Sequence, residues 1–216
     1  MTTEWRSEKT GLPLDVFARA ALPTQFGEFT IVAFSAGAER IEDVALVRGD
    51  VAGKTHVPTR LHSECLTGDV FHSLRCDCRQ QLERAQRHFS ELPLAIILYM
   101  RQEGRGIGLA NKVAAYKLQE EGYDTVEANE HLGFDDDLRS YDLAAAMLKA
   151  LGVASIDLYT NNPRKVEGLT RCGIRVTGRE PIVITPNAFN ERYLHTKADK
   201  SGHLLTFNKA LENDQA

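Results

Sequence analysis

Residues 94–119, with the sequence LAIILYMRQEGRGIGLANKVAAYKLQ, decide the fold class of this chain. The run Leu94–Met100 is short and continuously apolar, which is typical of a buried strand. A glycine-rich turn follows it. Apolar side chains then recur at helical spacing over Ile107–Gln119, and Gly122 ends the helix. A buried strand that leads through a tight turn into a helix indicates an α/β fold.

Similar patterns on both sides of this unit predict the remaining elements. Alternating apolar and polar residues predict strands over Phe26–Phe34, Ile41–Val47 and Val57–His62, and further short strands at Ile156–Tyr159, Ile174–Val176 and Ile182–Ile184. Helices are expected over residues 79–89, Tyr141–Leu151, Pro163 to near Gly173, and Asn187–His195. Strands cluster in the first half and alternate with helices in the second. The expected fold is therefore a single compact α/β (mixed α+β) domain, with a mixed sheet flanked by helices.

The composition limits the classes of protein to consider. The 216 residues are 43% hydrophobic and 26% charged, as in globular proteins, which excludes collagen-like and low-complexity disordered chains. The net charge of −4 gives no global basic field, so no nucleic-acid partner is expected. No apolar run approaches the roughly 20 residues of a membrane-spanning helix, so no membrane partner is expected. The polar N-terminus lacks the apolar core of a secretory signal, which predicts a cytoplasmic protein.

Three cysteines, Cys65, Cys76 and Cys78, form the pattern C-x10-C-x-C. In a cytoplasmic chain such cysteines are metal ligands, catalytic or simply buried rather than disulfide-bonded. Thiolates bind soft or borderline cations such as zinc, and three protein ligands leave one tetrahedral position open for water. An open position favours catalysis. The same spacing also fits three buried cysteines, or a closed structural zinc site with His62 or His72 as its fourth ligand.

A zinc nucleobase deaminase is a further interpretation of this region, because His62-Ser63-Glu64 matches the H-x-E half of the deaminase signature. The other half, P-C-x-x-C, is missing. A single residue, Asp77, separates the paired cysteines, and no proline precedes them. The deaminase interpretation is therefore disfavoured.

Two glycine- or asparagine-containing turns predict anion binding. The segment RQEGRGIG at 101–108 follows the buried strand and opens a helix, so its backbone N–H groups and Arg105 could hold a phosphate. A tight glycine turn with solvated arginines explains the same residues. The Glu103 carboxylate could accept hydrogen bonds from N1–H and the N2 amine of guanine. A second cationic turn, TNNPRK at 160–165, again links a strand to a helix, and the two together favour a polyphosphate.

A resemblance to a known family rests on four stretches in a fixed order. They are RLHSECLTGDVFHSLRCDC at 60–78, RQEGRGIGLANKVAAYKLQ at 101–119, GYDTVEAN at 122–129 and TNNPRKVEGL at 160–169. With this spacing the chain resembles the GTP cyclohydrolase II family. The resemblance implies a homodimeric α/β enzyme that binds one zinc ion per chain and needs magnesium on the triphosphate. It implies hydrolysis of GTP to 2,5-diamino-6-(5-phosphoribosylamino)pyrimidin-4(3H)-one, formate and pyrophosphate, the first step of riboflavin biosynthesis.

The resemblance also implies roles for individual residues. Cys65, Cys76 and Cys78 would hold the zinc ion, and Tyr116 would position the attacking water. The residues implied to contact the nucleotide are Arg60, Leu61, His62, Ser63, Glu64, Gln81, Glu103, Gly104, Arg105, Thr125, Thr160 and Lys165. Of these, Glu103 and Gln81 suit the base. The three cations Arg60, Arg105 and Lys165 suit the phosphates.

The family's proposed acid/base and nucleophile pair falls on Asp137 and Arg139. A guanidinium stays protonated near pH 7 and has no free lone pair for attack on phosphorus. We therefore expect Arg139 to stabilise charge on the α-phosphate. The chain departs from the usual family pattern at His72 and Arg79, which are commonly glycine, and in the loop Asp135-Asp136-Asp137-Leu138, which commonly contains proline.

Weak patterning at the two ends predicts a flexible N-terminal extension at residues 1–20 and a tail at residues 208–216. The resemblance implies a catalytic domain over residues 21–207. Two other functions stay open. One is a family branch that stops at the formamidopyrimidine nucleotide and retains formate. Tyr116 favours complete hydrolysis over that branch, because family members that retain formate tend to lack this tyrosine. The other is a non-catalytic guanine-nucleotide sensor with structural zinc, which has no need for an open metal site.

Overall fold

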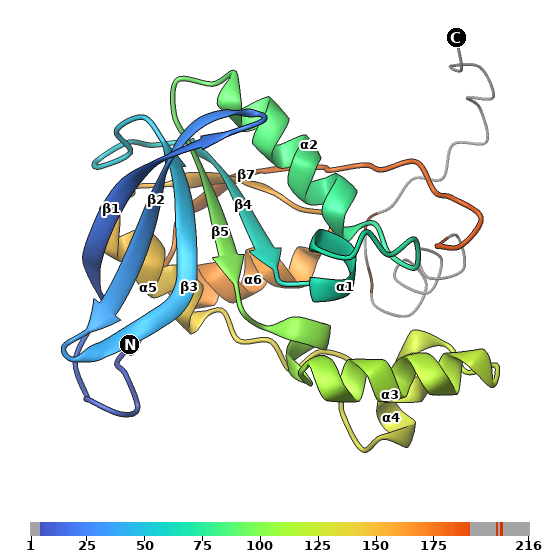
Figure 1. The fold of residues 1–216 in the computed structure, drawn as a ribbon. Coiled ribbons are helices and arrows are strands. Elements are labelled where there is room, and N and C mark those ends of the chain that lie inside the picture. Colours follow the sequence, from blue (N-terminus) through green and yellow to red (C-terminus); the bar gives the residue numbers. More distant parts are fainter. Residues whose placement is uncertain (1–4, 191–201, 203, 205–216) are drawn as a thin grey trace, which may run out of the picture.

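One seven-stranded mixed sheet organises the chain (Figure 1). The computed structural model describes residues 5–190, 202 and 204. The strand order is β1-β2-β3-β5-β4-β6-β7. β1, β2, β3 and β5 are antiparallel neighbours, whereas β5, β4, β6 and β7 run parallel. The strands are β1 (Asp15–Thr24), β2 (Gly27–Ala36), β3 (Glu39–Arg48), β4 (Val57–Ser63), β5 (Ala95–Met100), β6 (Ile156–Tyr159) and β7 (Val176–Glu180). The α/β fold with a mixed sheet is confirmed.

Helices cover both faces of this sheet, and the strand β5 shows why. Its residues alternate between the two faces, so Ile96 and Leu98 pack on one side and Ala95 and Ile97 on the other. The first side is covered by α5 (Asp142–Ala150) and α6 (Pro163–Arg171). The second side is covered by α2 (Cys78–Ser90), which buries Phe89 there. Since β5 is buried on both faces, it is continuously apolar, as its sequence predicts.

The remaining helical segments lie beyond the carboxyl ends of β4 and β5 (Figure 1). These parallel strands end side by side, with Ser63 opposite Met100. The chain that leaves β4 forms α1 (Leu66–Asp69), and the chain that leaves β5 forms the 3-10 turn η1 (Glu103–Gly106), α3 (Leu109–Glu120) and α4 (Thr125–His131). Ligand sites of open α/β sheets lie at this edge.

The N-terminal part of the sheet differs from the sequence-based expectation. Residues 15–20, which the sequence places in a flexible extension, form the first part of β1. Their side chains are mostly exposed, so these residues show no alternation of apolar and polar side chains. Backbone pairing with β2, from Asp15 opposite Ser35 to Thr24 opposite Gly27, forms the strand instead.

The other predicted elements are confirmed to within a few residues, except in three places. The helix α4 was not predicted, although its N-cap Asp124 and Glu127 form a capping box. In place of the two short strands expected at 174–176 and 182–184, one strand, β7, runs over Val176–Glu180, and residues 182–184 form no strand. Beyond β7, Asn161 satisfies the backbone of Ile182 through side-chain hydrogen bonds of 2.5 and 3.0 Å.

The helix predicted to start at Asn187 is a turn through residue 190, and its residues 191–195 lie outside the described residues, as does the tail at 208–216. Within residues 5–190, no helix is long and apolar enough to span a bilayer.

Candidate active site

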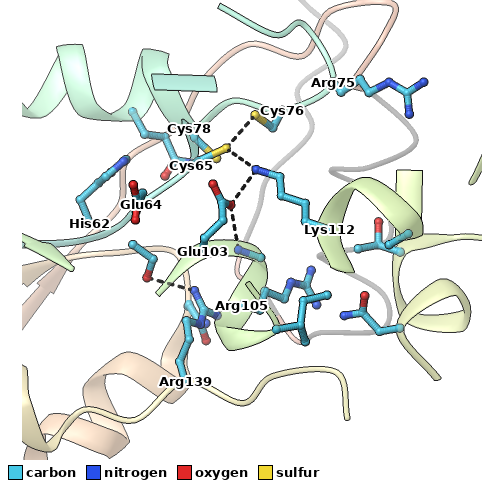
Figure 2. A pocket seen from close by; sticks show the side chains of 18 of the residues that line it. His62, Glu64, Cys65, Arg75, Cys76, Cys78, Glu103, Arg105, Lys112 and Arg139 are labelled. Atoms are coloured by element: carbon cyan, nitrogen blue, oxygen red, sulfur yellow. Dashed lines mark hydrogen bonds and ion pairs between the residues drawn. The ribbon is translucent and has the colours of Figure 1, made fainter. Parts of the chain in front are cut away.

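A pocket opens at the carboxyl ends of β4 and β5, between α2 and the segments η1, α3 and α4 (Figure 2). It brings together residues that the sequence analysis singled out: Arg60, His62, Ser63, Glu64, Cys65, Cys76, Cys78, Gln81, Glu103, Gly104, Arg105, Tyr116, Thr125, Arg139, Thr160 and Lys165. Two predicted residues do not line it. Leu61 is fully buried in the core. Asp137 reaches the pocket only through its hydrogen bonds to Arg139.

The three predicted metal ligands converge on one side of the pocket. The sulfur atoms of Cys65, Cys76 and Cys78 all lie within 4.8 Å of one another, and those of Cys65 and Cys76 are 3.6 Å apart. Two thiolates that bind one tetrahedral zinc ion at about 2.3 Å have sulfurs about 3.8 Å apart. Cys65 directly precedes α1 and Cys78 is the first residue of α2, so the sulfurs of these two cysteines lie at the N-terminal ends of two helices. The donor set therefore fits a zinc ion.

The fold leaves room for this sulfur cluster at Gly68. A Cβ atom at Gly68 would lie 2.8 Å from Cys76 Sγ and 3.1 Å from Cys65 Sγ, so only glycine allows α1 to pack against the sulfurs. Among the described residues, no histidine joins the group. His72 is exposed on its loop, and His62 is bonded elsewhere. Neither histidine forms the fourth ligand considered from the sequence.

His62 belongs to a buried network around Asp69. Its Nε2 lies 3.0 Å from Asp69 Oδ2, which also accepts hydrogen bonds from the Tyr99 hydroxyl at 2.9 Å and the backbone N–H of Cys65 at 3.1 Å. Burial lowers the pKa of His62 even though Asp69 opposes this, so the imidazole is neutral at pH 7. Asp69 therefore orients both the imidazole at the pocket wall and the start of the cysteine segment.

Glu103 and Lys112 form an ion pair beside the sulfurs (Figure 2). Glu103 accepts hydrogen bonds from Lys112 Nζ at 2.7 Å, from the Leu66 N–H at 2.7 Å and from the Gly104 N–H at 2.8 Å. A carboxylate has about four acceptor positions, and three are engaged by these donors. The contact of Glu103 with a base stays a prediction, and in this structure the carboxylate joins η1 to the residue after Cys65.

The surroundings of Cys65 favour its thiolate form. Hydrogen bonds from the Cys76 and Cys78 thiols, together with the ammonium of Lys112, lower the pKa of Cys65 well below that of a free thiol. Lys112 Nζ lies 3.1 Å from this sulfur. A thiolate is the form that binds metal, so the protein itself stabilises the ligand form of Cys65.

Tyr116 lies next to the cluster through Thr67. Its hydroxyl is 3.2 Å from Thr67 Oγ1, and Thr67 Oγ1 is 3.7 Å from Cys65 Sγ. The guanidinium of Arg75 lies over the ring at 4.9 Å from its centre. Burial raises the pKa of Tyr116, so its hydroxyl keeps its proton at pH 7 and can donate a hydrogen bond into the pocket.

Arg139 and Asp137 form a bidentate pair on the opposite side of the pocket. Arg139 Nε donates to Asp137 Oδ1 at 2.7 Å, and Nη2 donates to Oδ2 at 2.6 Å. Arg139 Nη1 reaches Ser63 Oγ at 3.5 Å. Burial alone would raise the pKa of Asp137, but the hydrogen bonds and charge of Arg139 bring it below its usual value. The structure thus presents a charged guanidinium that is held by a charged carboxylate.

A second carboxylate, Asp136, binds two further arginines. It accepts hydrogen bonds from Arg105 and, at 3.0 Å, from Arg164 Nη1 at the start of α6. The backbone supports this contact, because Leu138 N donates to Arg105 O at 3.0 Å. A Cβ at Gly106 would lie 3.1 Å from the Leu138 backbone, so η1 and the aspartate loop are in close contact.

The cations Arg60 and Lys165 are buried at the base of the pocket. Arg60 donates to Tyr159 O at 3.0 Å and to Gln81 Oε1 at 2.5 Å, and Gln81 in turn donates to Asp77. Burial lowers the pKa of Arg60 to about 10, which leaves it charged at pH 7. Lys165 Nζ donates to Leu61 O at 2.7 Å. Both cations are therefore oriented by the protein rather than by solvent.

The other predicted contacts have structural partners as well. Thr160 Oγ1 accepts from the Asn162 N–H at 3.0 Å, and Asn162 caps α6. Glu64 lies 3.8 Å from Arg101 Nε, and burial raises the pKa of its carboxyl. Thr125 is the first residue of α4. Gly104 has a φ of 61°, which glycine adopts without strain, and this conformation aims the η1 turn into the pocket.

Sequence reasoning missed several residues of this site, above all Lys112, Asp69 and Gly68. Lys112 precedes Tyr116 by four residues on α3, so both side chains lie on one face of the helix. This spacing could have predicted that Lys112 lies near the predicted site residue Tyr116. The contacts of Asp69 and Gly68 gave no signal, because they depend on how the turn after Cys65 folds back on β4 and α2.

Comparison with known proteins gives a consistent result. A family model described as GTP cyclohydrolase II matches residues 15–181. The GTP cyclohydrolase-2 of Citrobacter koseri is 55% identical over 188 residues, which cover 87% of this chain and 96% of that relative. The riboflavin biosynthesis protein RibBA of Endomicrobium trichonymphae is 52% identical over 184 residues, 85% of this chain. This chain spans about half of that relative, 46% of its length.

A likeness to one solved structure is much weaker. RibBX, a two-domain 3,4-dihydroxy-2-butanone 4-phosphate synthase from A. baumannii, is 15% identical, with a TM-score of 0.41, over 80% of this chain and 40% of that one. A likeness at that level does not define the fold.

Proposed function

Because the chain belongs to the GTP cyclohydrolase II family and is a hydrolase of riboflavin biosynthesis, we propose that its pocket carries out the complete family reaction. GTP is hydrolysed to 2,5-diamino-6-(5-phosphoribosylamino)pyrimidin-4(3H)-one, formate and pyrophosphate. One observation carries this proposal. Three convergent cysteine sulfurs lie beside Tyr116 on one side of a pocket whose other side presents Arg105 and Arg139.

The sulfurs of Cys65, Cys76 and Cys78 would hold one zinc ion, and magnesium would arrive with the triphosphate. A zinc ion with three protein ligands supplies Lewis acidity and lowers the pKa of its water to about 7. Two facts about this chain support the assignment. The distance between the Cys65 and Cys76 sulfurs suits a shared ion, and Gly68 leaves the space beside them free of side-chain atoms.

The pocket would orient GTP between its two sides. C8 of the guanine faces the sulfur cluster, and the triphosphate lies toward Arg105, Arg139 and Lys165. These cations are held at fixed positions before substrate arrives, so little side-chain entropy is lost on binding. The N-terminal end of α6, which follows Thr160, adds a positive dipole end on the same side.

Tyr116 would position the water that attacks C8 and then the formamide. Its Oη keeps its proton at pH 7 and is anchored to Thr67, so it offers a directed donor next to the sulfurs. This supports complete hydrolysis with loss of formate, in preference to the formamidopyrimidine product.

Arg139 would stabilise the negative charge that develops at the α-phosphate. Its bidentate pairing with Asp137 supports a charged guanidinium, which has no free lone pair for attack on phosphorus. Asp137 holds this guanidinium through both of its carboxylate oxygens and so orients it toward the phosphate side. We also infer a homodimer, on the strength of the family resemblance.

Mass spectrometry of the products tests the proposal. Zinc-loaded protein of measured metal content is incubated with GTP and magnesium, and formate, pyrophosphate and nucleotide products are measured together. The proposal requires equal amounts of formate, pyrophosphate and diaminopyrimidine. A product that is heavier by a formyl group would assign the chain to the formate-retaining branch. Tight GTP binding without turnover would assign it to a nucleotide sensor.

A further inference from the structure

Lys112 occupies a position in this pocket to which neither the sequence analysis nor the family comparison gives a role. It projects from α3 toward the sulfur cluster (Figure 2). Its Nζ lies 3.1 Å from Cys65 Sγ and 2.7 Å from Glu103 Oε1. Its side chain is 11% exposed and that of Glu103 is 9% exposed. A lysine ammonium is costly to remove from water, so its placement beside a metal-binding thiolate needs an explanation.

The contacts of Lys112 connect three segments that build the cluster. Glu103 Oε1 accepts from Lys112, and its other oxygen accepts from the Leu66 N–H, directly after Cys65. The ammonium itself contacts the Cys65 sulfur. Lys112 therefore joins α3 to both the backbone and the side chain of the Cys65 segment. The ammonium has three N–H donors, and one of its two polar contacts is to the sulfur, so Lys112 acts on the Cys65 side chain as well as on Glu103.

That effect follows from charge. Three thiolates and one divalent cation give a centre with a net charge of −1, next to the place where a polyanionic nucleotide binds. A positive group at 3.1 Å from one sulfur offsets this charge in a partly buried site. An N–H···S hydrogen bond also withdraws electron density from the thiolate. The thiolate then donates less to the metal, which stays a stronger Lewis acid.

We propose that Lys112 is a positioning residue of the metal centre, which orients the Cys65 sulfur and offsets the excess negative charge of the three thiolates. This inference rests on the proposed function, because it requires a metal ion at the cysteines. Lys112 acts through Cys65 and Glu103, and it does not bind the triphosphate. The predicted consequence of its loss is therefore a slower chemical step with unchanged nucleotide binding.

The test compares Lys112→Met, which keeps the aliphatic length, with Lys112→Arg, which keeps a charged N–H donor. Lys117→Met is the matched control. Lys117 lies on the same helix, is 70% exposed and pairs only with the exposed Glu120 among the described residues. Each protein is loaded with Co²⁺ at one equivalent, and the sulfur-to-cobalt charge-transfer absorption is recorded. The kcat and KM for GTP are then measured on the zinc-loaded proteins.

We expect Lys112→Met to move the charge-transfer band to longer wavelength, because a thiolate without its hydrogen bond gives up an electron more easily. Its kcat should fall about 10- to 100-fold, the usual cost of losing a group that supports a metal ligand, while KM stays unchanged. Lys112→Arg should return the band toward its wild-type position. Lys117→Met should match the wild type in every measurement.

Two results would overturn the proposal. A Lys112→Met protein with a wild-type band would show that the ammonium does not act on the sulfur. A rise in KM with unchanged kcat would make Lys112 a substrate ligand. Circular dichroism spectra that match the wild type ensure that a slower variant is still folded. Failure of the proposed function is distinguishable, since wild-type protein would then show no sulfur-to-cobalt band at all.

Discussion

The two sides of the pocket are built differently. On the sulfur side, the backbone N–H groups of Cys65 and Leu66 donate to the carboxylates of Asp69 and Glu103, which fixes the start of the cysteine segment. On the phosphate side, two arginines are paired with carboxylates of one loop. Arg139 is held by Asp137, and Arg105 by Asp136. The sulfur side is a set of metal ligands with one lysine–carboxylate pair beside it, whereas the phosphate side presents arginines that are paired with carboxylates.

Because of this difference, GTP binding has different energetic requirements on the two sides of the pocket. A polyanion that approaches the arginines competes with carboxylates that already neutralise them, so binding exchanges one anion for another. No such exchange is required at the sulfurs. We therefore expect substitutions on the sulfur side to act on metal retention and kcat, and substitutions on the phosphate side to act more evenly on binding and catalysis.

The largest effect is expected for Cys65→Ser. A serine oxygen is a poor ligand for zinc, so both the zinc content and the rate of formate release should fall strongly. The rate should fall by more than about 100-fold, since even outer contacts of a metal ligand cost 10- to 100-fold. Metal analysis and a formate assay measure this directly. Cys172→Ser is the control, because Cys172 lies outside the pocket and bonds only Asp142 among the described residues. Unchanged formate release from zinc-free Cys65→Ser protein would remove zinc from the mechanism.

Gly68→Ala should weaken the sulfur side without removing a ligand. The new methyl group would lie 2.8 Å from Cys76 Sγ, so the sulfurs must separate. We expect the affinity for zinc to fall about 10- to 100-fold in competition with a chromogenic chelator. Gly178→Ala is the control: Gly178 lies in β7, and its new methyl group would meet the Asp157 side chain instead of a cysteine, so zinc affinity should stay at the wild-type value. Equal affinities in both variants would mean that the sulfur cluster is not closely packed against α1.

Arg139→Lys tests the phosphate side of the pocket. Lysine keeps the positive charge but cannot form the bidentate hydrogen bonds that the guanidinium makes with Asp137. The loss of one charged hydrogen bond, about 1.5 kcal/mol, corresponds to a roughly 10-fold decrease in kcat/KM for GTP. Zinc content should not change, and metal analysis of the same samples checks this. A variant that loses zinc would show that the two sides are not separable.

The smallest effect is expected for Asp136→Asn, which removes the negative charge that competes for Arg105 and Arg164. We expect GTP to bind about two- to fivefold more tightly, which is the scale of a partly exposed ion pair. The measurement is the KM for GTP at low and high salt, with Asp135→Asn as the neighbouring control. Weaker binding in Asp136→Asn would mean that the carboxylate orients Arg105 for the nucleotide instead of competing with it.

The parts of the molecule that could be predicted from the sequence are those with local signals. The strand β5 is apolar along its whole length, and the three cysteines lie within one short segment, so both features could be predicted from the sequence. The helix α4 carried its capping box in the sequence, but seven residues are too few to show apolar periodicity. The edge strand β1 had no such signal, since its pairing with β2 is a backbone property.

Contacts in the pocket between residues of different segments could not be predicted from the sequence for a different reason. Lys112 meets Cys65 because η1 turns the chain between β5 and α3, with positive φ at both Gly104 and Arg105. Nothing in the residues themselves predicts a left-handed conformation at Arg105, which is rare for a residue with a side chain. The types of residue in the site were predictable, but their partners depend on this turn.

X-ray absorption at the zinc edge of the purified protein shows whether three cysteines hold zinc with one position open to water. We expect three sulfur neighbours at about 2.3 Å and one oxygen neighbour at about 2.0 Å. We also expect Cys65→Ser to lose this spectrum. A fourth sulfur, a histidine nitrogen in place of the oxygen, or zinc bound with fewer than three sulfurs would contradict an open three-cysteine site.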